Sequence, residues 1–228
     1  MMAQQYWNDI GAKKVFEDPL YIDKLQPFLS STAQIVEYGC GYGRMMRLLK
    51  SAGYHNLIGF DFAPNMITRG LRENPDLDLR LLEKAGVIPN GDESIDAMVM
   101  STVLCCITDE QKLVELMAEI RRVLKKQGVL YITDFLICEH PRYQEKYSSG
   151  MQQFGEWGIY TTNENLTVRH FTTKLIMHLL NAFDIQWFEQ FDFKTMNQNP
   201  ARTFHCIAKK SFKRKQFSPK GLPNTFAR

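Results

Sequence analysis

The fold follows from one stretch of the sequence, Ile35-Val36-Glu37-Tyr38-Gly39-Cys40-Gly41-Tyr42-Gly43. Its first residues predict a buried strand, and the three glycines at alternate positions predict a tight turn at the end of that strand. A helical run, Arg44 to Lys50, follows at once. Glycine leaves the backbone of such a turn open, so that the turn amides and the start of the helix can face a ligand.

Asp61 lies eighteen residues after Gly43, at the end of a second apolar run, Asn56-Leu57-Ile58-Gly59-Phe60. In a doubly wound sheet, an acid at that distance binds ribose hydroxyls. The turn and Asp61 together predict a nucleoside-containing cofactor at the carboxyl ends of the first two strands. The dinucleotide fingerprint requires a third glycine where this chain has Arg44. A nicotinamide dinucleotide oxidoreductase is therefore an alternative that Arg44 disfavours.

The glycine turn resembles the first motif of the class I S-adenosylmethionine-dependent methyltransferases, in which an acid precedes three alternate glycines. The matching residues are Glu37, Gly39, Cys40, Gly41 and Gly43. The resemblance continues in the same order through residues 59–66, 92–99 and 116–134, and it covers residues 30–210. It implies an α/β fold, a doubly wound seven-stranded, mostly parallel Rossmann-like sheet with an antiparallel C-terminal strand pair. It also implies S-adenosylmethionine as cofactor and S-adenosylhomocysteine as product.

The resemblance places the cofactor at the carboxyl ends of the strands. The amino-acid end is expected at Glu37 and the turn amides, the ribose at Asp61, and the adenine between Phe62 and Met66. Each of these residues also has a purely structural interpretation. Glu37 could be a buried acid paired within the sheet, Asp61 a helix cap, and Phe62 and Met66 core residues. The full expected set is Glu37, Gly39, Cys40, Gly41, Asp61, Phe62, Met66, Lys84, Ala85, Ser101 and Thr102.

One of these positions departs from the family pattern. Many members have an acid after the third strand, which contacts the adenine amino group. Alignment on Ile88-Pro89 places Lys84 there, followed by Ala85. A lysine cannot accept a hydrogen bond from an amine. Backbone atoms, or Glu83 after a shift of one residue, are therefore expected to serve the adenine.

Methyl transfer is an in-line displacement on an activated electrophile, so alignment can supply much of the reduction in the barrier. A base is needed only where the acceptor arrives protonated. The candidates on or near the expected acceptor side are His140, Tyr160, His170, Glu164 and Asp134. A purely structural role is the competing interpretation for each of them.

The acceptor is predicted from the segment after the fourth strand, Ser101-Thr102-Val103-Leu104-Cys105-Cys106. This segment lacks the (Asp/Asn)-Pro-Pro-Tyr motif of amino-group methyltransferases and the Pro-Cys of cytosine-C5 enzymes. Residues 135–170 are rich in Tyr, Phe, Trp and Gly without a clear period. We expect an insertion over the carboxyl edge of the sheet, either an acceptor pocket or a plain hydrophobic lid. The prediction is a small-molecule acceptor.

Short apolar runs alternate with amphipathic ones, which predicts a parallel sheet with helices on both faces. Strands are expected at 34–38, 56–60, 78–82, 96–101, 128–134, 185–193 and 203–208. Helices are expected at 43–52, 64–73, 109–125 and from Thr172 or Thr173 to Phe183. Gln127-Gly128 is expected to end the third of them. Residues 1–29 predict two helical pieces, broken near Pro19 and before Pro27, that cover the cofactor or pad the sheet.

The composition, 228 residues with 44% hydrophobic, predicts one domain with insertions. The expected parts are a helical cover (1–29), a methyltransferase domain (30–208) and a basic, disordered tail (209–228). No apolar stretch reaches the ~18 residues that span a bilayer. Five scattered cysteines without a CxxC pair predict no metal site and fit a reducing cytoplasm.

Charge is divided unevenly along the chain. The formal charge is +3 in all and +7 in residues 209–228, which leaves −4 for residues 1–208. An acidic body argues against a nucleic-acid partner. Two alternatives stay open, which are methylation of RNA or protein guided by the tail, and a fold relative that binds the cofactor without transferring methyl. No feature points to a particular oligomeric state.

Overall fold

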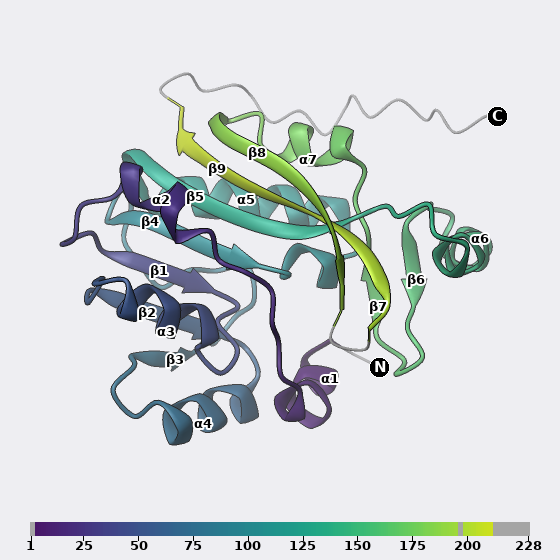
Figure 1. Ribbon diagram of the computed structural model, residues 1–228, viewed down its shortest axis with the longest axis horizontal. Coiled ribbons are helices and arrows are strands. Elements are labelled where there is room, and N and C mark those ends of the chain that lie inside the picture. Colours follow the sequence, from purple (N-terminus) through teal and green to yellow (C-terminus); the bar gives the residue numbers. More distant parts are fainter. Residues whose placement is uncertain (1–2, 196–197, 212–228) are drawn as a thin grey trace.

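A seven-stranded sheet forms the centre of the computed structural model, which describes residues 3–195 and 198–211 (Figure 1). The strand order is β3-β2-β1-β4-β5-β9-β8. Neighbours from β3 to β5 are parallel, and β9 is antiparallel to both β5 and β8. The predicted doubly wound sheet with an antiparallel C-terminal pair is confirmed. The strands are β1 Ile35–Tyr38, β2 Leu57–Asp61, β3 Leu79–Leu81, β4 Ile95–Ser101, β5 Leu124–Leu136, β8 Phe183–Lys194 and β9 Pro200–Lys210.

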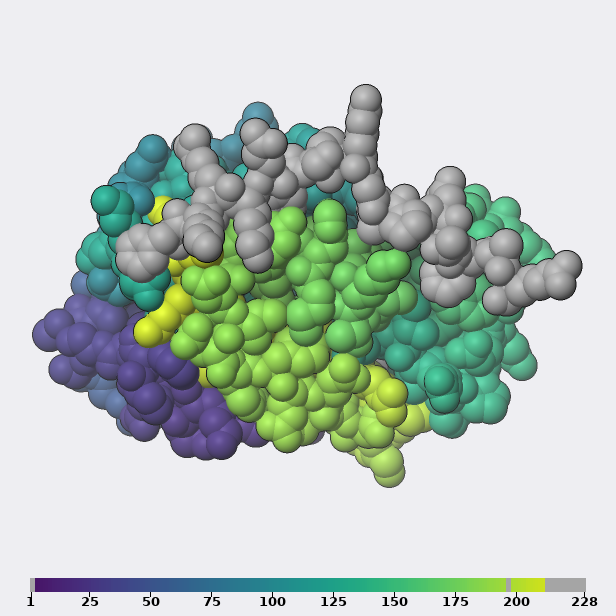
Figure 2. Space-filling model, turned by 90° about the horizontal axis from the view of Figure 1, so that it is seen from above, coloured from purple at the N-terminus to yellow at the C-terminus, as the bar shows by residue number. Residues whose placement is uncertain are grey.

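Helices cover both faces of the sheet because its strands are apolar on both sides. On one face, α5 (Glu110–Val123) and α7 (Thr173–Leu179) pack on alternate residues of β4, β5 and β9. On the other face, α3 (Arg44–Ser51) and α2 (Ile22–Leu25) pack on the intervening residues. The helix α4 (Pro64–Glu73) lies beside β3. Figure 2 shows the molecule from the side of β8 and α7, in light green.

The transition from α5 to β5 differs from the prediction. The helix ends at Val123, and β5 begins directly at Leu124 rather than after Gln127-Gly128. Leu124 is fully buried and pairs with Ile95, whereas the next aligned pair is Ala97 with Val129. The polar residues between them bulge out of the strand, and Gln127, not Gly128, has the positive φ. Burial of Leu124 therefore decides where the helix stops.

The insertion has regular structure that the sequence analysis missed. It contains α6 (Pro141–Phe154) and an antiparallel hairpin of β6 (Ile159–Thr161) and β7 (Thr167–Arg169). The buried residues of α6 are Tyr143, Tyr147 and Gly150. Their spacing of four and three is helical, but it is carried by two tyrosines and a glycine rather than by aliphatic residues. A Cβ on Gly150 would lie 1.8 Å from the carbonyl oxygen of Ile159, so helix and hairpin are in close contact.

The N-terminal segment forms α1 (Ala3–Asp9) and two short 3₁₀ helices, η1 (Gly11–Lys13) and η2 (Gln26–Phe28), with α2 between them. Figure 1 shows α1 between α4 and the β6–β7 hairpin. The third 3₁₀ helix, η3 (Leu104–Cys106), follows β4. Within the described residues, none of the helices is long and apolar enough to cross a membrane.

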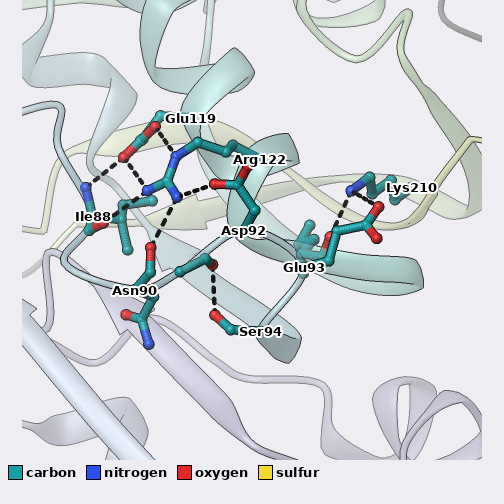
Figure 3. Close-up of polar contacts among 10 residues, drawn as sticks. Ile88, Asn90, Asp92, Glu93, Ser94, Glu119, Arg122 and Lys210 are labelled. Carbon is teal, nitrogen blue, oxygen red and sulfur yellow. Dashed lines mark hydrogen bonds and ion pairs between the residues drawn. The ribbon is translucent and has the colours of Figure 1, made fainter.

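The first two residues of the predicted basic tail belong to the sheet. Lys209 and Lys210 belong to β9, and Lys210 is buried. Its Nζ donates to Glu93 at 3.1 Å and to the carbonyl of Leu124 at 2.7 Å (Figure 3). The remainder of the predicted tail, 212–228, lies outside the described residues.

A polar network holds the chain that leads into β4. Arg122 of α5 donates to Glu119, to Asp92 and to the carbonyls of Ile88 and Asn90 (Figure 3). Residues 88–94 precede β4, so this network lies at the amino end of the strands. It fixes the crossover between β3 and β4 at the end of the sheet opposite to the glycine turn.

Candidate functional site

The glycine turn adopts the conformation that the sequence predicts. Gly39, Gly41 and Gly43 have φ values of 75°, 54° and 84°, which residues with a side chain rarely adopt. A Cβ on Gly39 would lie 2.4 Å from Cγ2 of Val103, which follows β4. The turn therefore packs directly against the segment after β4, and substitution of Gly39 would separate these two parts of the carboxyl edge.

Asp61 joins the turn to the start of α4. Its Oδ2 accepts a hydrogen bond from the amide of Gly41, and its Oδ1 accepts one from the amide of Ala63, both at 2.8 Å. Ala63, not Asp61, is the N-cap residue of α4. Burial raises the pKa of the Asp61 carboxyl, and the backbone hydrogen bonds oppose that shift. Each oxygen keeps acceptor capacity for a hydroxyl group of a ligand.

Within the described residues, two buried side-chain oxygens at the carboxyl edge have no hydrogen-bond partner. They are Oε2 of Glu37, at the end of β1, and Oγ of Ser101, at the end of the neighbouring β4. Burial raises the pKa of Glu37, and the nearby charge of Arg44 opposes that shift. Buried polar atoms in folded proteins nearly always have a hydrogen-bond partner. These atoms are therefore suited to an ammonium or hydroxyl group of a ligand beside the glycine turn.

The other residues expected at the cofactor lie in the glycine turn, after β4, after β2 and in α4. Cys40 is buried against Gly59, and Thr102 has a positive φ while its amide donates to the carbonyl of Thr133. The carbonyl of Phe62 accepts a hydrogen bond from Gln4 Nε2 at 2.9 Å. Met66 is buried among Tyr42, Ala63 and aromatic residues of the N-terminal segment.

Lys84 and Ala85 are exposed in the loop after β3. In the same loop, the amide of Gly86 donates to the hydroxyl of Tyr38 at 2.7 Å, which ties the loop to the end of β1. No contact in the described part of the structure engages the Lys84 ammonium.

His170 is the centre of a buried polar cluster within the insertion. Its Nδ1 lies 2.7 Å from the hydroxyl of Tyr147, and its Nε2 lies 3.1 Å from the hydroxyl of Tyr160. The imidazole also stacks on Phe135, with 5.1 Å between ring centroids. Burial lowers the pKa of His170 to about 3, so the ring is neutral. The sequence analysis missed Tyr147 because it did not recognise α6.

The third expected base is placed differently. His140 is exposed, and its Nδ1 accepts a hydrogen bond from the amide of Arg142 as the N-cap of α6. The structure therefore brings Tyr160 and His170 together and assigns His140 to the start of a helix. No hydrogen bond joins His140 to the other two in the described chain.

The neutral state of His170 has a consequence for stability. Its pKa is about 3 in the folded protein and about 6.5 in the unfolded chain, so acid protonates the unfolded state first. The contribution of the neutral His170 ring to the free energy of unfolding is complete above pH 6.5 and is lost as the pH falls towards 3. Between about pH 7 and pH 4.5, we expect the wild type to lose about 2 kcal/mol more unfolding free energy than His170→Gln. Urea denaturation at both pH values measures this, and equal losses would contradict it.

Asp134 ends the buried part of β5 and fixes the turn after β4. Its Oδ2 accepts from the amide of Cys105 at 3.0 Å, and its Oδ1 accepts from the amide of Phe135 at 2.8 Å. Burial raises the pKa of the Asp134 carboxyl to about 7. A hydrogen bond with Cys106, burial and the charge of Asp134 raise the pKa of the Cys105 thiol, which is therefore a poor nucleophile. In residues 3–195 and 198–211, no group of three or more His, Cys, Asp or Glu side chains is arranged to hold a metal ion.

Comparison with known proteins bears directly on this edge of the sheet. Residues 36–132, which span the glycine turn, Asp61 and the turn after β4, match the family described as a methyltransferase domain. The chain thus contains a methyltransferase domain and resembles the class I S-adenosylmethionine-dependent methyltransferases. It is an enzyme, and its cofactor is S-adenosylmethionine. No curated protein sequence matches it significantly.

Solved methyltransferase structures resemble this one over most of its length. An S-adenosylmethionine-dependent methyltransferase from Methanosarcina mazei is 25% identical, with a TM-score of 0.77 over 85% of this chain and 99% of that one. An S-adenosylmethionine-dependent methyltransferase from Anabaena variabilis is 19% identical, with a TM-score of 0.65 over 91% and 93%. A chain in the complex between the Haloferax volcanii Trm112 methyltransferase activator and a methyltransferase is 15% identical, with a TM-score of 0.60 over 86% and 90%. The last two likenesses concern the fold alone.

Proposed function

We propose that this methyltransferase methylates a small-molecule acceptor held between the carboxyl edge of the sheet and the insertion. The observation that carries the proposal is the buried aromatic cluster of the insertion. It comprises Tyr6, Tyr143, Tyr147, Tyr160, Leu166 and Val168, and Cys106 from the turn after β4 packs against it. An apolar, aromatic wall of this kind would suit a small acceptor and would keep water away from the transfer.

The cofactor residues in this proposal are those at the carboxyl edge. When bound, S-adenosylmethionine supplies a methyl group on a sulfonium that is already activated for displacement. Glu37 Oε2 and Ser101 Oγ would accept hydrogen bonds from its amino-acid end, which the turn amides would also serve. Asp61 would accept hydrogen bonds from the ribose hydroxyls. The unpartnered buried oxygens support this assignment, because they need donors that the described part of the chain does not provide.

Tyr160 and His170 orient the acceptor rather than deprotonate it. Because burial holds the pKa of His170 at about 3, the imidazole is a weak base at neutral pH. Its fixed position between two tyrosine hydroxyls instead orients the Tyr160 hydroxyl. An acceptor that arrives with a free lone pair, and needs no base, fits this arrangement best.

The test is methyl transfer from S-adenosylmethionine to a panel of small amines, carboxylates, phenols and thiols, with S-adenosylhomocysteine and the methylated product detected by mass spectrometry. Tyr160→Phe is expected to lower kcat while leaving S-adenosylhomocysteine affinity unchanged, because Tyr160 contacts the acceptor and not the cofactor. Methyl incorporation into RNA or protein but into no small molecule would overturn the proposal.

A truncated chain distinguishes a small-molecule enzyme from the alternative in which the tail guides methylation of RNA or protein. The truncation removes 212–228 and keeps Lys210 and Ser211, since Lys210 is part of β9 and is hydrogen-bonded to Leu124. A small-molecule enzyme is expected to keep its rate without these residues. The proposal also keeps residues 1–29 as a cover over the cofactor and the methyltransferase domain from residue 30. It keeps a cytoplasmic location, with which the five free cysteines among the described residues agree.

A further inference from the structure

The N-terminal strap, residues 3–18, lies along the cofactor side of the molecule. Gln4 Nε2 donates to the carbonyl of Phe62 at 2.9 Å, one residue after Asp61. Asn8 accepts two hydrogen bonds from Asn65 at the start of α4, from the backbone amide at 2.9 Å and from the side-chain Nδ2 at 3.0 Å. Release of the strap would therefore expose the carboxyl end of β2 and the start of α4.

The middle of the strap packs on the glycine turn itself. Phe16 stacks on Tyr42 with 6.1 Å between ring centroids, and its amide donates to the Tyr42 hydroxyl at 3.1 Å. Trp7 and Ala12 pack on the same group, which includes Met66. The strap thus covers the segment between Gly41 and Gly43 as well as α4.

The same strap is tied to the insertion through one carboxylate. Glu164 lies in the turn between β6 and β7, and its Oε2 accepts a hydrogen bond from the Tyr6 hydroxyl at 2.5 Å. The Lys14 ammonium forms an ion pair with the same oxygen. Tyr6 and Lys14 lie on opposite sides of η1 in the sequence, so Glu164 binds the strap at two separate points.

The base of the hairpin is held far more firmly than its turn. Arg169, 2% exposed, pairs with Glu156 and lies 3.5 Å from Glu110, and it donates to the carbonyl of Thr108. Glu164 is 41% exposed. Breaking a buried ion pair is far more destabilising than breaking an exposed one. The turn of the hairpin can therefore separate from the strap while its base stays attached to α5.

We propose that Glu164 is a positioning residue that holds the strap and the hairpin closed as one unit, so that the cofactor and acceptor compartments open together. The inference depends on the proposed function only in naming the hairpin side as the acceptor side. It requires that loss of the Glu164 contacts loosens two segments distant in sequence, residues 3–18 and 159–169, and speeds cofactor release.

The test compares Glu164→Ala with Asp192→Ala, the matched control. Asp192 is also an exposed carboxylate in an ion pair, with Arg202, but it lies on β8. Stopped-flow fluorescence measures dissociation of S-adenosylhomocysteine, and hydrogen–deuterium exchange measures protection of both segments. Glu164→Ala is expected to release S-adenosylhomocysteine roughly tenfold faster and to lower protection in both segments. Asp192→Ala is expected to change neither.

Tyr6→Phe removes the hydrogen bond to Glu164 from the strap side. It is expected to lower the exchange protection of both segments, by less than Glu164→Ala does. Loosening of the hairpin alone, or unchanged release of S-adenosylhomocysteine in Glu164→Ala, would overturn the proposal. Neither measurement needs an acceptor. A failure of the small-molecule assignment therefore leaves these results intact, and a failure here leaves that assignment standing.

Discussion

Replacement of Asp61 by Ala is expected to weaken S-adenosylmethionine binding by at least about tenfold. Each charge-assisted hydrogen bond from a ribose hydroxyl contributes roughly 1.5–3 kcal/mol, and about 1.4 kcal/mol is a factor of ten. The same change releases the amides of Gly41 and Ala63, both held by Asp61 at 2.8 Å. The variant therefore loses both the ribose acceptor and the link between the glycine turn and α4. Isothermal titration calorimetry measures the affinity.

Asp76→Ala is the matched control, because Asp76 is exposed and pairs with Lys50 at the end of α3. Its affinity for S-adenosylmethionine is expected to equal that of the wild type. Asp61→Asn keeps the shape of the side chain but removes its charge, and an intermediate affinity is expected. Near-normal binding by Asp61→Ala would remove Asp61 from the cofactor site.

Replacement of Arg169 by Ala is expected to lower the free energy of unfolding by about 3–5 kcal/mol. The guanidinium is buried and joins Glu156 of the insertion to Thr108 and Glu110 at the start of α5. Without it, the carboxylate of Glu156 loses its bidentate partner and the carbonyl of Thr108 loses a donor. Urea denaturation, followed by circular dichroism, measures the loss.

Arg202→Ala provides the comparison, since Arg202 pairs with a single carboxylate, Asp192, at the surface. Its expected cost is about 0–1 kcal/mol. The difference between the two arginine variants measures the combined effect of burial and of the additional partners of Arg169, Glu110 and Thr108. If the two variants lost equal stability, Arg169 would not anchor the hairpin to the body.

The sheet and the glycine turn could be predicted because their signals are local. Glycines at alternate positions, an acid after the second strand and alternating apolar runs each depend on a few neighbouring residues. The predicted β1 and β2 match the observed strands within one residue at each end. The core confirms the two-faced sheet, since Val36 and Ile35 belong to opposite clusters.

The parts that escaped prediction depend on contacts between distant residues. In α6, the residues that pack against the hairpin include Tyr143 and Tyr147. The helical spacing of buried residues is therefore carried by tyrosines and not by aliphatic residues. The early end of α5 follows from the pairing of Leu124 with Ile95. The partners of Arg169 come from two separate segments. A single sequence shows which residues can form such contacts, but the three-dimensional structure selects the pairs that meet.

The most direct test of the account is calorimetric titration of the full chain with S-adenosylmethionine, S-adenosylhomocysteine and NADH. The glycine turn, with Arg44 in place of the third glycine, and Asp61 predict that both sulfur nucleosides bind and that NADH does not. Binding of NADH alone would contradict the account and would make the chain an oxidoreductase with an unusual phosphate-binding turn.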